Sequence, residues 1–258
     1  MTNASPIRQR LLDALLSAFR DDPRALALYQ GGSAAFGRDD QYSDLDMQLV
    51  VSDDHVDEAV QGIERALEAA AGIEARYIIP QPAWHGGWQG FYRLRGAGPY
   101  LLVDILVLKQ SAPSYFSEPE LHGKAIVYFD RTGRVGGERL DRDKNREQIR
   151  ARVARIAATT DMFHCFVDKE AARGRPVDAM MLYHQMVLSP LVETLRMIHC
   201  PDRFGFGPRY LQYDLPAAEY AKVESLYYMA GPDQLLPRKK AAYDWLRRNL
   251  EQLQRDNP

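Results

Sequence analysis

The sequence predicts an α+β protein, in which a mixed β-sheet with flanking helices is followed by a C-terminal α-helical bundle. Short β-type runs separated by turn residues occupy the chain from Leu26 to about Asp130. Beyond the polar, glycine-containing segment DRTGRVGGERLDRDKN, the patterns become long and helical, with few strand-forming residues. This change of character predicts two domains, residues 1–140 and 141–258.

The first domain should build the sheet. A helix is expected from His55 to about Ala71, and the segment from Pro80 to Gly90 is typical of a hairpin loop because it holds two prolines and three glycines. Trp84 and Trp88 in that loop either cap the core or stand exposed at a ligand site, and the core is favoured. The expected strands are Ala25–Gln30, Leu45–Val51, Glu74–Ile79, Gly90–Arg95, Tyr100–Leu108 and Ala125–Phe129.

The second domain should be a small helical bundle. Apolar residues recur close to helical periodicity from Asn145 to about Arg173, where Gly174 is placed to end the helix. A second helix should begin at Pro176, a residue that suits a first helical turn, with a kink at Pro190. Two shorter helices are expected at Ala217–Met229 and Arg238–Leu253.

Composition limits the classes of partner. The 258 residues are 46% hydrophobic, and 33 Lys and Arg stand against 35 Asp and Glu, a net charge of −2. This balance gives no overall electrostatic reason to bind nucleic acid or an anionic membrane. No run approaches the roughly 20 apolar residues that span a bilayer, and the amphipathic pattern from Ile7 to Phe19 does not resemble an export signal. We therefore expect a cytoplasmic protein without membrane partners, in which Cys165 and Cys200 are buried reduced thiols.

Two carboxylates stand close together in the stretch YQGGSAAFGRDDQYSDLDMQLVV. Asp44 and Asp46 flank Leu45, so on a strand they point to one face while Leu45 points to the other. Like charges this close raise each other's pKa unless a cation lies between them, and Mg²⁺ suits hard oxygen ligands. The alternative is an edge strand with an acidic solvent face, which is favoured for an isolated D-x-D. Tyr42 and Ser43 offer hydroxyls at the strand entrance, although loop solvation explains them nearly as well.

Two further features favour a metal and phosphate site. Gly31, Gly32 and Ser33 follow an expected strand, where small residues let backbone amides and a hydroxyl approach a phosphate. Asp104 lies in the otherwise apolar run YLLVDILVL, and a lone carboxylate there is costly unless a cation pairs with it. A metal shared with the first two carboxylates would explain its position.

These residues carry a resemblance to a known family. GGS, then ten residues, then DLDM resembles the signature of the nucleotidyltransferase superfamily, which includes DNA polymerase β and the antibiotic nucleotidyltransferases, and Asp104 matches its third carboxylate. The stretches GRDDQYSDLD and ARGRPVDAMMLYHQMVLSPLVETLR are similar to lincosamide nucleotidyltransferases and their aminoglycoside-modifying relatives. The likeness of layout covers most of the chain and is specific at the motif.

The resemblance implies an activity. A nucleoside monophosphate, AMP from ATP or another NTP, would pass to a hydroxyl of a small molecule such as a lincosamide or aminoglycoside antibiotic, with release of pyrophosphate and the help of two Mg²⁺ ions. Such a protein would confer antibiotic resistance. Asp44 and Asp46 would hold both metals. Asp104 would complete the metal site or accept the hydroxyl proton, because the family uses its third carboxylate in both ways.

The resemblance also implies a separate role for each domain. The first would be catalytic, with Gly31, Gly32, Ser33 and Ser43 on the nucleotide, and the helical domain would bind the acceptor. Arg173, with Lys169 and Arg175, either reaches the triphosphate or stabilises a helix C-terminus. Polar residues on apolar helices are candidates for acceptor contacts, although each alone is more often solvated or locally paired: Asp161, His164, Asp168, His184 and Glu193.

Other functions remain open at this stage. A toxin-like or RNA-tailing enzyme of the same fold would modify RNA or protein, but RNA needs a basic track that the near-neutral charge does not suggest. A nucleotide-binding protein without turnover is a third possibility, which the presence of all three carboxylates weakens. Antibiotic nucleotidyltransferases are often dimers, so a homodimer is also open.

Overall fold

The computed structural model describes residues 6–256. The chain divides into two compact units, Met1–Arg139 and Leu140–Pro258, and each is described by itself. The first unit contains a mixed sheet with flanking helices and the second is helical, which confirms the α+β class.

The sheet of the first unit has six strands in the order β3-β4-β5-β2-β1-β6. Strands β2 and β5 run parallel, whereas every other neighbouring pair is antiparallel. The predicted bounds of β1 and β2 are confirmed, and those of the other strands differ by one or two residues. The strands are β1 Ala25–Gln30, β2 Leu45–Val51, β3 Ile73–Ile78, β4 Trp88–Leu94, β5 Leu102–Lys109 and β6 Ile126–Asp130.

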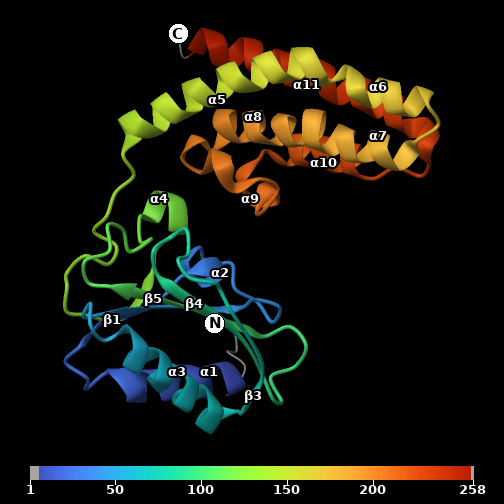
Figure 1. Ribbon diagram of the computed structural model, residues 1–258. Coiled ribbons are helices and arrows are strands. Elements are labelled where there is room, and N and C mark those ends of the chain that lie inside the picture. Colours follow the sequence, from blue (N-terminus) through green and yellow to red (C-terminus); the bar gives the residue numbers. More distant parts are fainter. Residues whose placement is uncertain (1–5, 257–258) are drawn as a thin grey trace. The chain divides into compact units, whose positions relative to one another are not determined.

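Two amphipathic helices, α1 (Pro6–Phe19) and α3 (Val56–Ala70), cover one face of this sheet (Figure 1). The buried residues of α1, Leu11, Leu15 and Phe19, recur every four positions and therefore form one stripe. They pack with residues of α3 and with the inward-pointing residues of the central strands. Each fully buried leucine contributes about 1.5–3 kcal/mol, so this cluster is the main core of the unit.

The opposite face of the sheet is only partly covered. A small apolar cluster lies there, built around Tyr29, Val50, Leu108 and Tyr115. The one-turn helices α2 (Gly32–Ala35) and α4 (Pro119–His122) lie on this side (Figure 1). Asp46 and Gln48 on β2 and Asp104 on β5 also point to this face, so the sheet offers polar side chains beside α2.

The loop before β4 corrects one expectation. Trp84 is 88% exposed, so it does not lie in the core. Its neighbours His85 and Gly86 form a turn with it at the tip of the hairpin, where no apolar layer reaches. The next strand begins at Trp88, two residues before the start that we expected, and Trp88 packs against the main core as predicted.

The second unit is a bundle around one apolar core. Val187, Leu191 and Leu246 are among its fully buried residues. Cys165 and Cys200 are free and only partly buried. Within residues 6–256, no helix has the length and apolar character needed to cross a membrane. The helical segments are α5 Arg142–Phe163, α6 Cys165–Ala172, α7 Pro176–Tyr183, η1 His184–Leu188, α8 Ser189–His199, η2 Pro201–Phe206, α9 Leu211–Asp214, α10 Ala217–Tyr227, η3 Pro232–Gln234 and α11 Leu235–Asp256.

Both long helices expected in this unit are interrupted. The first breaks at His164, between α5 and α6, before Gly174 ends it with a φ of 70°. The second contains a π-helical turn, η1, immediately before Pro190 in the first turn of α8. Proline has no N–H to donate and its ring crowds the preceding turn. A wider turn at this point relieves that crowding.

Candidate active site

The pairing of β2 with β5 brings the predicted carboxylates together. Asp46 lies directly opposite Asp104 in the parallel register, and their flanking residues Leu45 and Val103 are buried on the core side. Because side chains alternate along a strand, both carboxylates point to the partly covered face. Asp44, two residues before Asp46, approaches the same edge, where the backbone N–H of Leu102 donates to its carboxylate.

The carboxyl group of Asp104 lies in an environment that disfavours its ionised form. Gln89, on β4, donates from Nε2 to its Oδ1 over 2.7 Å. The pKa of Asp104 is raised to about 6: burial is the largest cause, the Gln89 bond opposes it, and the charges of Asp46 and Asp44 add to the increase. A cation beside these carboxylates would offset the part of the increase that comes from the charges of Asp46 and Asp44.

Asp44 is held at the strand entrance by a residue far away in the sequence. The guanidinium of Arg8, on α1, donates to the carbonyl oxygens of Asp44, over 2.9 Å, and of Ser43. Burial raises the pKa of Asp44, while the Leu102 bond and the charge of Arg8 lower it. Arg8 therefore fixes the backbone that carries the first carboxylate.

The glycines before α2 let the loop lie directly on the second carboxylate. Gly32 has a φ of 58°, and a Cβ at this position would lie 1.8 Å from Oδ2 of Asp46. Gly31 donates from its N–H to the carbonyl of Asp46 over 3.0 Å, and a Cβ on it would lie 2.9 Å from Nε2 of Gln48. Glycine is required at position 32, where φ is positive and a side chain would occupy the space of the carboxylate, whereas a side chain at position 31 would displace the Gln48 amide. Ser33, in the first turn of α2, follows them directly.

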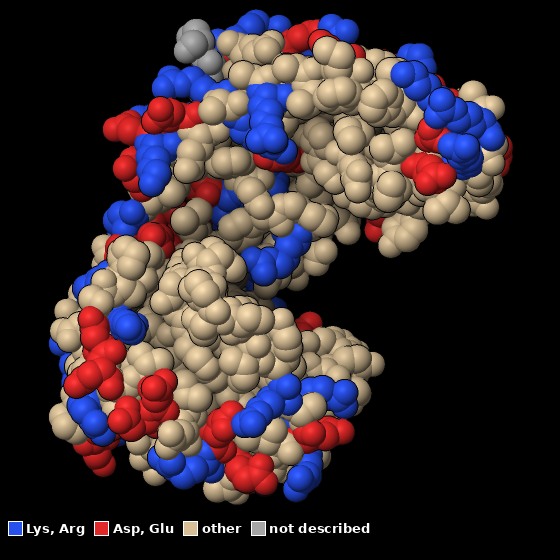
Figure 2. Space-filling model, in the orientation of Figure 1, with Lys and Arg blue, Asp and Glu red and all other residues tan. Residues whose placement is uncertain are grey.

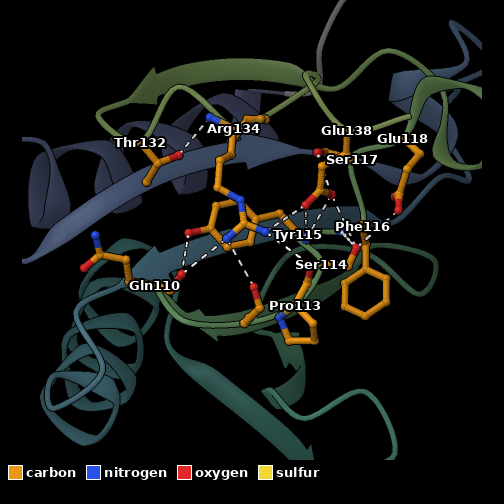
Figure 3. Close-up of polar contacts among 12 residues, drawn as sticks. Gln110, Pro113, Ser114, Tyr115, Phe116, Ser117, Glu118, Thr132, Arg134 and Glu138 are labelled. Atoms are coloured by element: carbon orange, nitrogen blue, oxygen red, sulfur yellow. Dashed lines mark hydrogen bonds and ion pairs between the residues drawn. The ribbon is translucent and has the colours of Figure 1, made fainter. Parts of the chain in front are cut away.

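A polar network supports the face beside this loop (Figure 3). The Glu138 carboxylate accepts from the backbone N–H of Tyr115 over 3.0 Å, from Ser117 over 3.2 Å and from Arg134 over 2.9 Å. The Arg134 guanidinium lies 3.8 Å above the centre of the Tyr115 ring, and the hydroxyl of Tyr29 donates to the Tyr115 carbonyl. Tyr29 is next to last in β1, so the network braces the strand that leads into the glycine loop.

Two residues expected on the nucleotide have local partners instead. The Ser43 hydroxyl donates to Oδ1 of Asp40 over 3.0 Å and accepts from the Asp40 N–H over 2.9 Å, so it closes a turn. Arg173, in the helical unit, pairs with Glu170, which also pairs with Arg175 over 3.2 Å. These contacts explain both residues locally, and their role on a nucleotide stays a prediction.

The candidates for acceptor contacts also have partners within the helical unit. Glu193 pairs with Arg152 through two bonds of 2.7 Å, and Asp168 pairs with Lys239 over 2.7 Å. His164 lies 3.0 Å from the same ammonium group, which together with burial lowers its pKa. Asp161 accepts from Tyr243 and His184 contacts Tyr227. Their binding role likewise stays a prediction.

The metal ions stay a prediction, and the structure shows only which side chains could hold them. Among the described residues, no three His, Cys, Asp or Glu side chains converge closely enough to hold a metal ion as they stand. Asp44, Asp46 and Asp104 nevertheless supply carboxylate oxygens, and the charges of Asp46 and Asp44 help to raise the pKa of Asp104. Hard, negatively charged oxygen donors fit Mg²⁺.

Sequence reasoning missed Arg8 and Gln89. Arg8 belongs to an amphipathic helix and Gln89 to a hairpin, and neither is near the motif in the sequence. Only the sheet order, in which β4 borders β5, brings Gln89 to Asp104.

Comparison with known proteins gives a distant match. No protein-family model and no curated protein matches the chain. Solved structures that match include an aminoglycoside 6-adenyltransferase from Bacillus subtilis, with 14% sequence identity over 94% of this chain and 88% of that chain and a TM-score of 0.33. A likeness at this level carries no argument about activity.

Proposed function

We propose that this chain is a Mg²⁺-dependent nucleotidyltransferase. It transfers a nucleoside monophosphate, AMP from ATP, to a hydroxyl of a small molecule such as a lincosamide or aminoglycoside antibiotic. The observation that carries the proposal is the contact of the Gly32 backbone with the Asp46 carboxylate, opposite Asp104 in the strand register. The glycine loop, which is suited to bind phosphate, therefore lies against Asp46 and Asp104, whose carboxylates are suited to bind a metal ion.

The reaction forms one bond and breaks one. The acceptor oxygen bonds to the α-phosphorus of ATP while the bond from that phosphorus to the bridging oxygen of the β-phosphate breaks, and pyrophosphate leaves. Asp44 and Asp46 would hold two Mg²⁺ ions, which neutralise phosphate charge and lower the pKa of the acceptor hydroxyl. Gly31, Gly32 and Ser33 would position the β- and γ-phosphates.

Asp104 is the residue to which we assign the role of general base, which accepts the proton of the acceptor hydroxyl. Burial, the largest cause of its raised pKa, persists beside a bound metal and favours the protonated form that results when it accepts a proton. Gln89 occupies Oδ1, so Oδ2 is the oxygen that would take the acceptor proton. Gln89 then fixes the orientation of the base.

The distribution of charge favours a small acceptor over RNA. On the face drawn in Figure 2, blue and red side chains are interspersed in each unit and form no continuous basic track. The net charge of −2 agrees with this. A protein that tracks a nucleic-acid backbone needs a basic groove.

The proposal is tested by pyrophosphate release. The full chain is incubated with Mg²⁺ and each NTP, with and without lincosamides, aminoglycosides and other polyols. We expect release that depends on ATP and on one acceptor class, and a loss of at least about 100-fold in Asp46→Asn, because the charge that holds the metal is removed. Asp13→Asn, which changes an exposed carboxylate of α1, should retain full activity.

The same assay separates the competing functions. Transfer of label from [α-³²P]ATP to tRNA or to cell protein, with no small acceptor modified, would favour a macromolecular target. Tight binding of ATP without transfer to any acceptor would indicate a nucleotide-binding protein without turnover.

A further inference from the structure

Two exposed tyrosines meet beside the carboxylates. The ring centroids of Tyr42 and Tyr100 are 5.1 Å apart and their planes are inclined by 80°, an edge-to-face contact. Although they contact each other, Tyr42 is 57% exposed and Tyr100 is 60% exposed. Within the unit, therefore, more than half of this aromatic surface stays open to solvent.

Tyr42 and Tyr100 lie at equivalent positions just before β2 and β5, the two strands that carry the site. Asp46 lies opposite Asp104, and Tyr42 and Tyr100 each precede one of these residues by four positions. Between them, the N–H of Leu102 reaches the carboxylate of Asp44. Parallel strands present their entrances at one edge, so the tyrosines border the acidic site at that edge.

Both rings are held on fixed backbone. The N–H of Tyr42 donates to Oδ1 of Asp40 over 2.9 Å in the turn that Ser43 closes, and Arg8 binds the next two carbonyls. Tyr100 is followed by Leu101, which is buried. A rigid aromatic surface loses little conformational entropy when a planar ligand stacks on it.

We propose that Tyr42 and Tyr100 form the surface on which the nucleobase of the substrate stacks. The inference rests on the proposed nucleotidyltransfer, because the nucleobase is the planar ring that this reaction requires, whereas the acceptor needs only a hydroxyl. Stacking is tolerant of base identity, since every base has a π-face. The pair therefore adds affinity for nucleotides in general, with ATP and GTP bound within a few-fold of each other.

The test compares a nucleotide with a phosphate chain that has no base. Dissociation constants for ATP and for inorganic tripolyphosphate are measured with Mg²⁺ by calorimetry on the full chain and on Tyr42→Ala and Tyr100→Ala. We expect each substitution to weaken ATP binding about tenfold and to leave tripolyphosphate binding unchanged. Tyr42→Phe should retain the affinity for ATP, because it keeps the ring.

Trp84→Ala is the matched control. This indole is also exposed, but its hairpin precedes Trp88, which pairs with Val107 at the other end of β5. Its removal should change neither the dissociation constant for ATP nor that for tripolyphosphate.

The outcomes separate this inference from the proposed function. ATP binding that is equal in the wild type and in folded alanine variants would overturn the stacking surface alone. Equal losses for ATP and tripolyphosphate would also overturn it, because they indicate damage to the phosphate site. If the wild type binds neither ligand, the proposed function falls and the stacking surface falls with it.

Discussion

The carboxylate of Asp46 occupies the space where a side chain on Gly32 would begin. In Gly32→Ala the new Cβ would displace that carboxylate and would also be strained at a φ of 58°. We expect at least a 100-fold loss of acceptor-dependent pyrophosphate release, together with a lower free energy of unfolding in urea. Tripolyphosphate binding should weaken in parallel.

Gly37→Ala separates the two causes of that loss. Gly37 has a φ of 64°, close to that of Gly32, but a Cβ there would meet nothing within 4 Å. This variant should lose about 1–2 kcal/mol of stability from the backbone conformation alone and keep its activity. Equal activity in the two alanine variants would contradict the assigned contact.

Asp104 makes stability depend on pH in Mg²⁺-free solution. Its pKa is about 6 in the folded chain against an ordinary value of 3.8, so folding favours the protonated form. Stability from this group is therefore present at low pH and is lost as the pH rises toward and through 6.

Asp104→Asn removes this dependence while keeping an oxygen for Gln89. Relative to the wild type in EDTA, the variant should gain about 1 kcal/mol in the free energy of unfolding between pH 5 and pH 7.5. Urea titrations at the two values measure the gain. A constant difference between the two proteins would show that Asp104 has an ordinary pKa.

At the scale of elements, a buried ion pair organises the segment between α8 and α10. Arg196 is fully buried and donates to Asp214 over 2.8 Å and to the carbonyl of Gly207 over 2.6 Å, while Arg203 donates to the same carboxylate over 2.7 Å. The two guanidinium groups lower the pKa of Asp214, although burial opposes them. Asp214→Ala leaves a buried charge without its main partner and should cost about 3–5 kcal/mol in unfolding experiments.

An exposed pair on α11 provides the contrast. Lys240 and Asp244 are also 2.7 Å apart, but the lysine side chain is 77% exposed. Asp244→Ala should therefore change stability by less than about 1 kcal/mol. A similar loss of unfolding free energy in Asp214→Ala and Asp244→Ala would show that burial does not determine how much the Arg196 pair contributes to stability.

Element types could be predicted from local pattern, whereas interruptions and neighbours could not. Strands β1 and β2 have the bounds expected from their apolar runs. The break at His164 was not predicted, because apolar periodicity continues across it; at Pro190 a kink was predicted, but not the π-helical turn that precedes it. Exposure of Trp84 was not predicted either, since its surroundings depend on how far the hairpin extends beyond the core.

The site was predictable to the extent that it lies in one stretch of chain. Asp44, Asp46 and the glycine loop are adjacent in sequence, and Asp104 was recognisable as a charge in an apolar strand. Gln89 and the tyrosine pair needed the sheet order, and Arg8 needed the packing of α1 against the sheet; no local pattern specifies either.

At the scale of the whole molecule, each unit has a core of its own. The apolar clusters around α1 and Tyr29 hold only residues of the first unit, and the bundle cluster holds only residues of the second. Asp214→Ala should therefore lower one urea transition and leave the other in place. Fluorescence can follow each, because Trp84 and Trp88 report on the first unit and Trp245 on the second. A single transition that shifts as a whole would show that the two units unfold together.

The central claim is that the acidic pair and the glycine loop transfer a nucleotide. The most direct measurement is the mass of each acceptor after incubation with the full chain, Mg²⁺ and ATP, with Asp46→Asn in parallel. The account predicts an acceptor heavier by one AMP, formed by the wild type and absent with the variant. An unchanged mass for every small acceptor, in a protein that binds ATP, would contradict it.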